Sequence, residues 1–175
     1  NWFKTENFSL NWSLYEKHGR GVKQGYSGKN FIEGEFISIL EKGIEELPIL
    51  VKEPIKLKAG NYRVYLKPAA ISEFIGVFSW GGFSMKEMKQ ETSPLIKMVK
   101  QETSVDERIS LYENFGSGFL TDFNEYGFKR PEKIELIKNG RLKDLLVGPR
   151  SAKEYELSCN GSQNNETPEF FEMEC

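Results

Sequence analysis

Residues 134–142 read IELIKNGRL, and this stretch decides the fold. Apolar Ile134 and Leu136 alternate with polar residues, which is the period of a strand with one buried face. Asn139-Gly140 then separates this run from the apolar residues that begin at Leu142, and both residues tolerate the positive φ of a type I′ turn. The stretch therefore predicts a β-hairpin and an antiparallel sheet.

The first third of the chain predicts one strand, one loop and one helix. Residues 7–15 alternate apolar and polar side chains and predict a strand. Four glycines interrupt the polar residues 19–28, which favours a loop. Residues 31–50 place apolar side chains on one helical stripe and glutamates on the other, so they predict a surface helix. Prolines then open a linker at residues 51–59.

The residue pattern in the middle of the chain predicts a strand, two helices and a second strand, in that order. Residues 62–66 alternate as a strand does, and Pro68 suits the first turn of a helix that runs to Trp80. Residues 84–90 predict a short helix, and residues 109–112 predict a strand.

The last third predicts a long glycine-containing loop at residues 114–127, then the hairpin, a short helix at residues 151–155 and a polar loop from Asn160 to the end. Helices are missing between the later strands, which argues against a doubly wound fold. We therefore predict an α+β fold, mainly an antiparallel β-sheet with a few packed helices.

Length and charge exclude several classes of protein. A chain of 175 residues can bury a real core, and 24 basic against 26 acidic residues give a net charge of −2. This balance indicates neither nucleic acid nor a membrane surface as a partner. The chain starts at Asn1 without a leader pattern, which indicates an excised segment of a cytoplasmic protein.

Metal-binding side chains are scarce. Cys159, Cys175 and His18 are too few, and too far apart, for a zinc site within the segment. A disulfide between the two cysteines is not expected in a chain without secretion signals.

Several strings, in this order, resemble the TldD/PmbA family (modulator of DNA gyrase, zinc metallopeptidase). They are LKAGNYRVYLKPAA (57–70), SPL (93–95), FNEYG (123–127), IKNGRL (137–142), RSAKEY (150–155) and NG (160–161). The resemblance implies two parts, with residues 1–54 ending the middle family domain and residues 55–175 opening the C-terminal domain.

In the family's zinc-binding subunits, the helix after the Pro-Ala start carries His-Glu-x-x-x-His. The resemblance places these three positions at Gly76, Val77 and Gly81, whose side chains cannot bind zinc or transfer a proton. It therefore implies a TldE/PmbA-like subunit with no catalytic residue and no metal ligand of its own, beside a TldD-type partner that holds the zinc.

Such a subunit is expected to form a heterodimer, or a homodimer, that encloses extended peptides. Trp80 and Phe83 are then candidates for lining a peptide channel or an interface, although large aromatics most often pack in a core. Asn124, Glu125 and Gly127 are further candidates in an acidic-glycine loop that can equally be a structural turn.

Two alternative functions stay open at this point. The first is an active zinc peptidase whose ligands lie outside this segment. The second belongs to another class and is an interaction module that modulates DNA gyrase.

Overall fold

The computed structural model describes residues 2–175, which form two compact units. One unit comprises Lys4–Arg63, and the other comprises Val64–Cys175 together with residues 2–3. The chain joins them through residues 51–67, which form no strand and only a short turn at the start. Each unit has its own sheet, so each is described separately.

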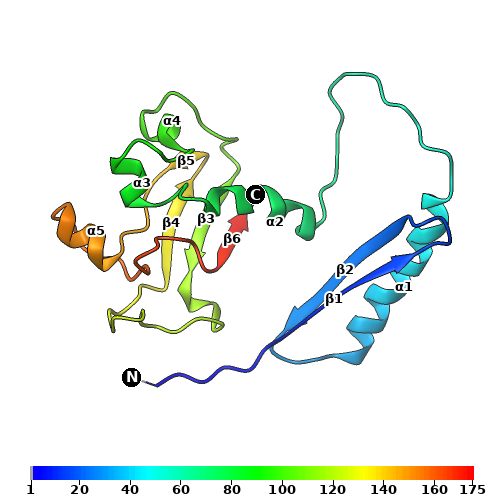
Figure 1. Cartoon of the computed structure of the whole chain (residues 1–175), viewed down its shortest axis with the longest axis horizontal. Helices are drawn as coiled ribbons and strands as arrows, with labels where there is room; N and C mark the ends of the chain where they lie inside the picture. The colour runs from blue at the N-terminus through cyan, green and yellow to red at the C-terminus, as the bar shows by residue number, and fades with distance from the viewer. Residues whose placement is uncertain (1) are drawn as a thin grey trace. The chain divides into compact units, whose positions relative to one another are not determined.

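The smaller unit is a β-hairpin covered by one helix. Strand β1 (Phe8–Tyr15) pairs antiparallel with β2 (Gly21–Gly28), and α1 (Glu33–Leu50) packs on one face (Figure 1). The predictions of a strand at 7–15 and a helix at 31–50 are confirmed. The helix continues through Pro48 for two more residues.

The predicted loop at residues 19–28 is wrong, because most of it forms β2. Val22, Gln24 and Tyr26 alternate toward α1, and Gln24 donates a hydrogen bond to the carbonyl of Ile39 at 2.6 Å. On the other face, a Cβ at Gly25 would lie 2.8 Å from Oδ1 of Asn11. Gly25 thus lies within a paired strand rather than in a flexible loop.

The larger unit holds a four-stranded antiparallel sheet in the order β5-β4-β3-β6. Its strands are β3 (Ser110–Asn114), β4 (Lys133–Lys138), β5 (Arg141–Leu142) and β6 (Phe171–Glu174). The predicted hairpin is confirmed as β4 and β5, with Asn139 and Gly140 at φ of 48° and 76°. The α+β fold predicted from sequence is confirmed.

Short helices surround this sheet. They are α2 (Pro68–Gly76), α3 (Met85–Lys89), α4 (Ile96–Val99) and α5 (Pro149–Glu154), with 3₁₀ turns at Val77–Ser79 and Phe115–Ser117 (Figure 1). The predicted helix start at Pro68 is confirmed, but its predicted end at Trp80 is wrong, because α2 ends at Gly76 and a 3₁₀ turn follows. The short helices predicted at 84–90 and 151–155 are confirmed. The sequence did not predict α4.

Two predictions in the larger unit are wrong. Residues 62–66 are not a strand, because no other strand pairs with them in the described part of the chain. The tail after Asn160 is not loop throughout, since Phe171–Glu174 pairs with β3 as β6. A segment therefore forms a strand where another strand is available to pair with it, and alternation of residue types alone is not sufficient.

The core of the larger unit lies between the sheet and helices α3 and α4. Phe83 and Leu136 are fully buried, and Ile137, Leu146 and Leu111 are at most 2 % exposed. The N–H of Leu146 donates a hydrogen bond to the carbonyl of Phe83, and the carbonyl of Leu146 accepts one from the N–H of Met85. These two bonds hold the segment after Gly82 beside the segment that follows β5.

Candidate functional site

The helix that follows Pro68 ends at the first of the three positions that the resemblance assigns to the zinc motif. Gly76 is the last residue of α2, Val77 starts a 3₁₀ turn, and Gly81 lies beyond that turn with φ of 78°. A Cβ at Gly81 would stand 2.8 Å from Cγ of Glu87. The three positions therefore lie on no common helix and offer no zinc donor, so they do not fit a zinc ion.

A groove of about 880 Å³ lies along α2 and β6. Its walls are mainly apolar and come from the segment before α2, from α2 itself and from β6: Val64, Leu66, Ile71, Ile75, Phe171 and Met173. Gly76 borders this groove, and Glu169 is the one acidic side chain that lines it in the described part of the chain. Gly76 is also the position to which the resemblance assigns the first zinc ligand.

A buried carboxylate holds the wall of the groove that precedes β6. Glu113 is 1 % exposed and accepts hydrogen bonds from the backbone N–H of Glu169 at 3.0 Å and of Phe170 at 2.8 Å. Burial raises the pKa of Glu113 to about 7, although the two N–H donors oppose the rise. The charged groups that act on this carboxyl are Glu169 and Arg130.

Arg130 supplies a positive charge beside the carboxyl groups of Glu113 and Glu169. Its side chain is 1 % exposed, pairs with the carboxylate of Glu169 at 2.5 Å and donates from Nε to the carbonyl of Gly161 at 3.1 Å. Its guanidinium also lies over the ring of Phe115, 4.6 Å from the centroid. Arg130, in the loop before β4, thus contacts the 3₁₀ turn after β3, the loop after α5 and the segment before β6.

Replacing Glu113 by glutamine should change how stability depends on pH. Because the pKa of Glu113 is raised, the folded protein binds a proton between pH 4.5 and about 7 that the unfolded chain does not bind. This group's contribution is therefore complete below pH 4.5 and is lost as pH rises toward 7. Urea unfolding of both proteins from pH 4.5 to 8 should show the variant gaining about 3 kcal/mol relative to wild type. Parallel pH profiles for the two proteins would contradict the assignment.

Hydrogen bonds of the Asn124 side chain hold the loop that contains it. Asn124 is 2 % exposed; its Oδ1 accepts from the N–H of Tyr126 and of Phe128 at 3.0 Å, and its Nδ2 donates to the carbonyl of Ser162. Gly127 has φ of 80°, which only glycine adopts without strain. Glu125 is exposed. Asn124 and Gly127 therefore have positions that shape a turn, and Glu125 is an exposed side chain on that turn.

Replacing Asn124 by alanine should destabilise the protein by about 1–3 kcal/mol, because two loop N–H groups and one carbonyl lose their partner. Replacing Asn124 by aspartate keeps the acceptor and should cost less. Denaturant unfolding measures both changes, and hydrogen exchange at the amides of Tyr126 and Phe128 locates them. Equal loss in the two variants would show that the acceptor does not hold the loop.

Trp80 and Phe83 have different surroundings. Trp80 is 83 % exposed, whereas Phe83 is fully buried between Phe78 and Phe171, with ring centroids 5.9 Å from each. Phe83 is thus part of the core and supports the groove from below. Trp80 remains a candidate for contact with a peptide or a subunit.

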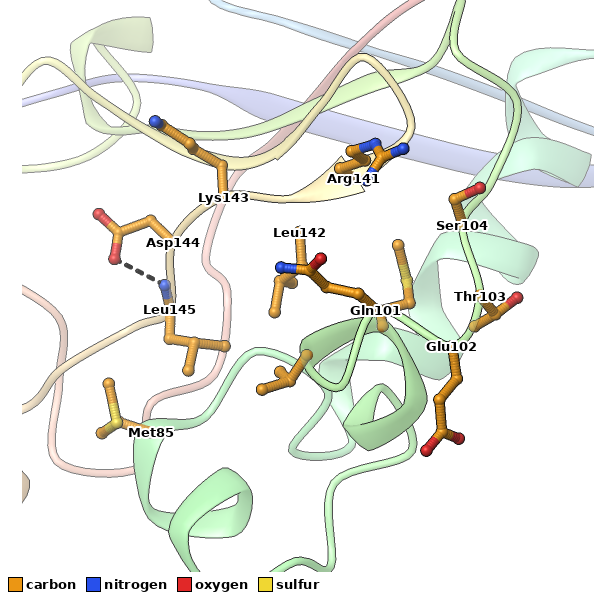
Figure 2. A pocket seen from close by; sticks show the side chains of 12 residues that line it. Met85, Gln101, Glu102, Thr103, Ser104, Arg141, Leu142, Lys143, Asp144 and Leu145 are labelled. Carbon is orange, nitrogen blue, oxygen red and sulfur yellow. Dashed lines mark hydrogen bonds between the residues drawn. The ribbon is translucent and has the colours of Figure 1, made fainter.

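A second hollow, of about 520 Å³, lies between α4 and the chain after β5. Figure 2 shows Met85, Leu142 and Leu145 around it, with Arg141 on one side and Asp144 on the other. Its rim mixes charges of both signs, and Asp144 already accepts from the N–H of Leu145 at 2.8 Å. None of the residues singled out from sequence borders it.

The described residues contain neither a cluster of metal-binding side chains nor a membrane-spanning helix. Within residues 2–175, no three His, Cys, Asp or Glu side chains gather as a metal site needs. Over the same range, no helix has the length and apolar character to cross a membrane.

Sequence reasoning missed Glu113, Arg130 and the groove. The first two were invisible because charged residues in a sequence are normally read as surface. The groove joins Val64–Leu66 to a strand that was itself not predicted. Alternation in Phe171, Met173 and Cys175 was the one available signal.

The fold and the groove define an α+β domain in which a short helix lies beside the edge strand of a small antiparallel sheet. Residues 59–171 match the family model described as the PmbA/TldA metallopeptidase C-terminal domain. This match covers more than half of the chain, so the chain belongs to the TldD/PmbA family. A comparison with curated proteins gave no match.

Solved structures share the fold at low sequence identity. A candidate modulator of a DNA gyrase from Thermotoga maritima is 16% identical with a TM-score of 0.66, over 93% of this chain and 38% of its own. TldE from Thermococcus kodakarensis is 18% identical with a TM-score of 0.65, over 96% and 40%. A candidate modulator of DNA gyrase from Bacteroides thetaiotaomicron is 15% identical with a TM-score of 0.65, over 96% and 38%. The chain thus spans about two fifths of the length of these proteins.

Proposed function

We propose that this chain is part of a TldE/PmbA-like subunit of a cytoplasmic TldD/TldE-type assembly, where it forms chamber wall and subunit interface and a TldD-type partner supplies the zinc. The observation that carries the proposal is the residue types at Gly76, Val77 and Gly81, where the resemblance expects histidine, glutamate and histidine. Neither glycine nor valine has a side-chain atom that can bind zinc. The ending of α2 at Gly76 adds support, because the backbone itself departs from a single motif helix.

The second support is the position of the apolar groove. It borders Gly76, the position to which the resemblance assigns the first zinc ligand, and apolar side chains from α2 and β6 line it. Such a surface suits contact with polypeptide better than proton transfer, because apolar contact area contributes most of the free energy of association. Trp80, 83 % exposed just beyond the 3₁₀ turn, offers an aromatic anchor of the kind enriched at interfaces.

Zinc analysis and peptide cleavage by the full-length protein test this proposal. The protein alone should contain no stoichiometric zinc and cleave no peptide, and cleavage should appear with a zinc-containing TldD-type subunit that co-elutes in size-exclusion chromatography. A pull-down with DNA gyrase is a parallel arm, in which binding by the isolated protein would favour an interaction module. Stoichiometric zinc together with cleavage by the protein alone would overturn the proposal.

A further inference from the structure

We propose that Glu113, Arg130 and Glu169 control a latch, the segment of residues 168–170. A proton on Glu113 keeps this latch segment closed against β3, and loss of the proton allows the segment to open. The inference does not depend on the proposed function. It follows from three features of the buried carboxyl group of Glu113: its hydrogen bonds, the charges beside it and the segment that it holds.

The first feature is that both N–H groups of the latch segment reach one oxygen of Glu113. Oε1 accepts from the N–H of Glu169 at 3.1 Å and from the N–H of Phe170 at 2.8 Å. Oε2 accepts only from the N–H of Glu169, at 3.0 Å. A proton on Oε2 would therefore leave each N–H with an acceptor, so the closed segment is compatible with a protonated Glu113.

The second feature is an unbalanced charge. Glu113 is 1 % exposed, and the charged groups that act on it are Glu169 and Arg130. The side chain of Arg130 is also 1 % exposed and already pairs with Glu169. Two carboxylates beside one guanidinium leave one negative charge unpaired away from water, which is unfavourable. A proton on Glu113 removes that charge.

The neighbouring strands add no charge on this face of the sheet. The residues that pair with Glu113 are Ile134 on β4 and Phe171 on β6, and both are apolar. Lys133 and Glu172, which flank them, point to the other face because side chains alternate along a strand. These two pair with each other at 2.8 Å. Protonation of Glu113 is therefore the remaining way to balance the charge beside the latch segment.

The third feature is the place of the latch segment in the fold. The segment leads directly into β6, and Pro168 and Glu169 line the groove along α2 and β6. When the segment opens, Glu113 reaches water and its pKa falls from about 7 toward the usual value of 4.5. Between these two pH values opening releases a proton, so the open fraction rises with pH. This wall of the groove should therefore become looser as pH rises toward neutrality.

Hydrogen exchange of the full-length protein, read by mass spectrometry on a proteolytic fragment that contains Glu169 and Phe170, measures the opening. Rates are corrected for the pH dependence of exchange in an unfolded chain. Exchange of these amides should then accelerate about tenfold for each pH unit between about pH 5 and 6.5, and become constant above about pH 7.5. At every pH it should be faster than exchange in β4, since the segment opens while the sheet stays folded.

Three variants identify the group that carries the proton. Glu113→Gln is uncharged at every pH and should remove the acceleration. Glu125→Gln is the matched control, because Glu125 is an exposed glutamate on the turn of Asn124 and its variant should keep the wild-type profile. Glu169→Gln leaves Arg130 to balance Glu113 alone, so the acceleration should occur at lower pH. Circular dichroism verifies that each variant remains folded.

A wild-type profile without pH dependence would overturn the inference, whether or not the variants fold. The same slope in Glu113→Gln as in wild type would also overturn it, because another group would then carry the proton. Equal rates in the latch fragment and in β4 would show that the segment opens only when the whole unit unfolds, which would contradict a latch.

Discussion

Replacing Phe83 by alanine is expected to lower the free energy of unfolding of the larger unit by about 3–5 kcal/mol. The ring is fully buried and contacts those of Phe78 and Phe171, so its removal would leave a cavity between the 3₁₀ turn Val77–Ser79 and β6. Phe74→Ala is the matched control, because Phe74 on α2 is 66 % exposed and should change stability little. Chemical denaturation followed by circular dichroism measures both.

A small effect of Phe83→Ala would mean that the core collapses around the site and that Phe83 does not support the groove. A large effect would show that the ring supports the wall of the groove, because Phe171 borders the groove and its ring packs against that of Phe83.

The second large effect is expected for Arg130→Met, which should cost about 3 kcal/mol at neutral pH. Methionine fills part of the space but leaves the carboxylate of Glu169 without its buried cation, next to the carboxyl of Glu113. Part of the loss should be recovered at lower pH, since protonation of Glu113 removes one of the two negative charges. Urea unfolding at pH 5 and pH 8 measures the cost and its pH dependence.

Arg108→Met is the control for this variant. Arg108 also pairs with a carboxylate, that of Asp106 at 2.8 Å, but its side chain is 80% exposed. Ion pairs in solvent contribute little to stability, so no measurable change is expected. If both arginine variants behaved alike, burial of the Arg130 pair would have no energetic consequence.

Local signals in the sequence predicted much of the fold. Asn139-Gly140 located the hairpin because both residues tolerate positive φ, and Pro68 located the start of α2 because its ring fixes φ near the helical value. Predictions failed where residue type and strand pairing disagree. β2 is rich in glycine but pairs with the preceding strand β1, whereas residues 62–66 alternate well yet have no strand beside them in the described part of the chain.

The candidate site was less accessible from sequence for the same physical reason. The family resemblance located Gly76, Val77 and Gly81, but the groove beside them needs β6, a four-residue strand at the other end of the unit. The role of Arg130 also depends on distant residues, since Glu169 and Gly161 lie more than thirty positions further along the chain. Contacts at such separations leave no local periodicity to read.

The buried guanidinium of Arg130 couples stretches of chain that are far apart in sequence. Its partners, the carbonyl of Gly161 and the carboxylate of Glu169, lose their hydrogen bonds whenever the segment around Arg130 opens. Amides in these three stretches should therefore exchange with solvent at similar rates, as members of one cooperative unit.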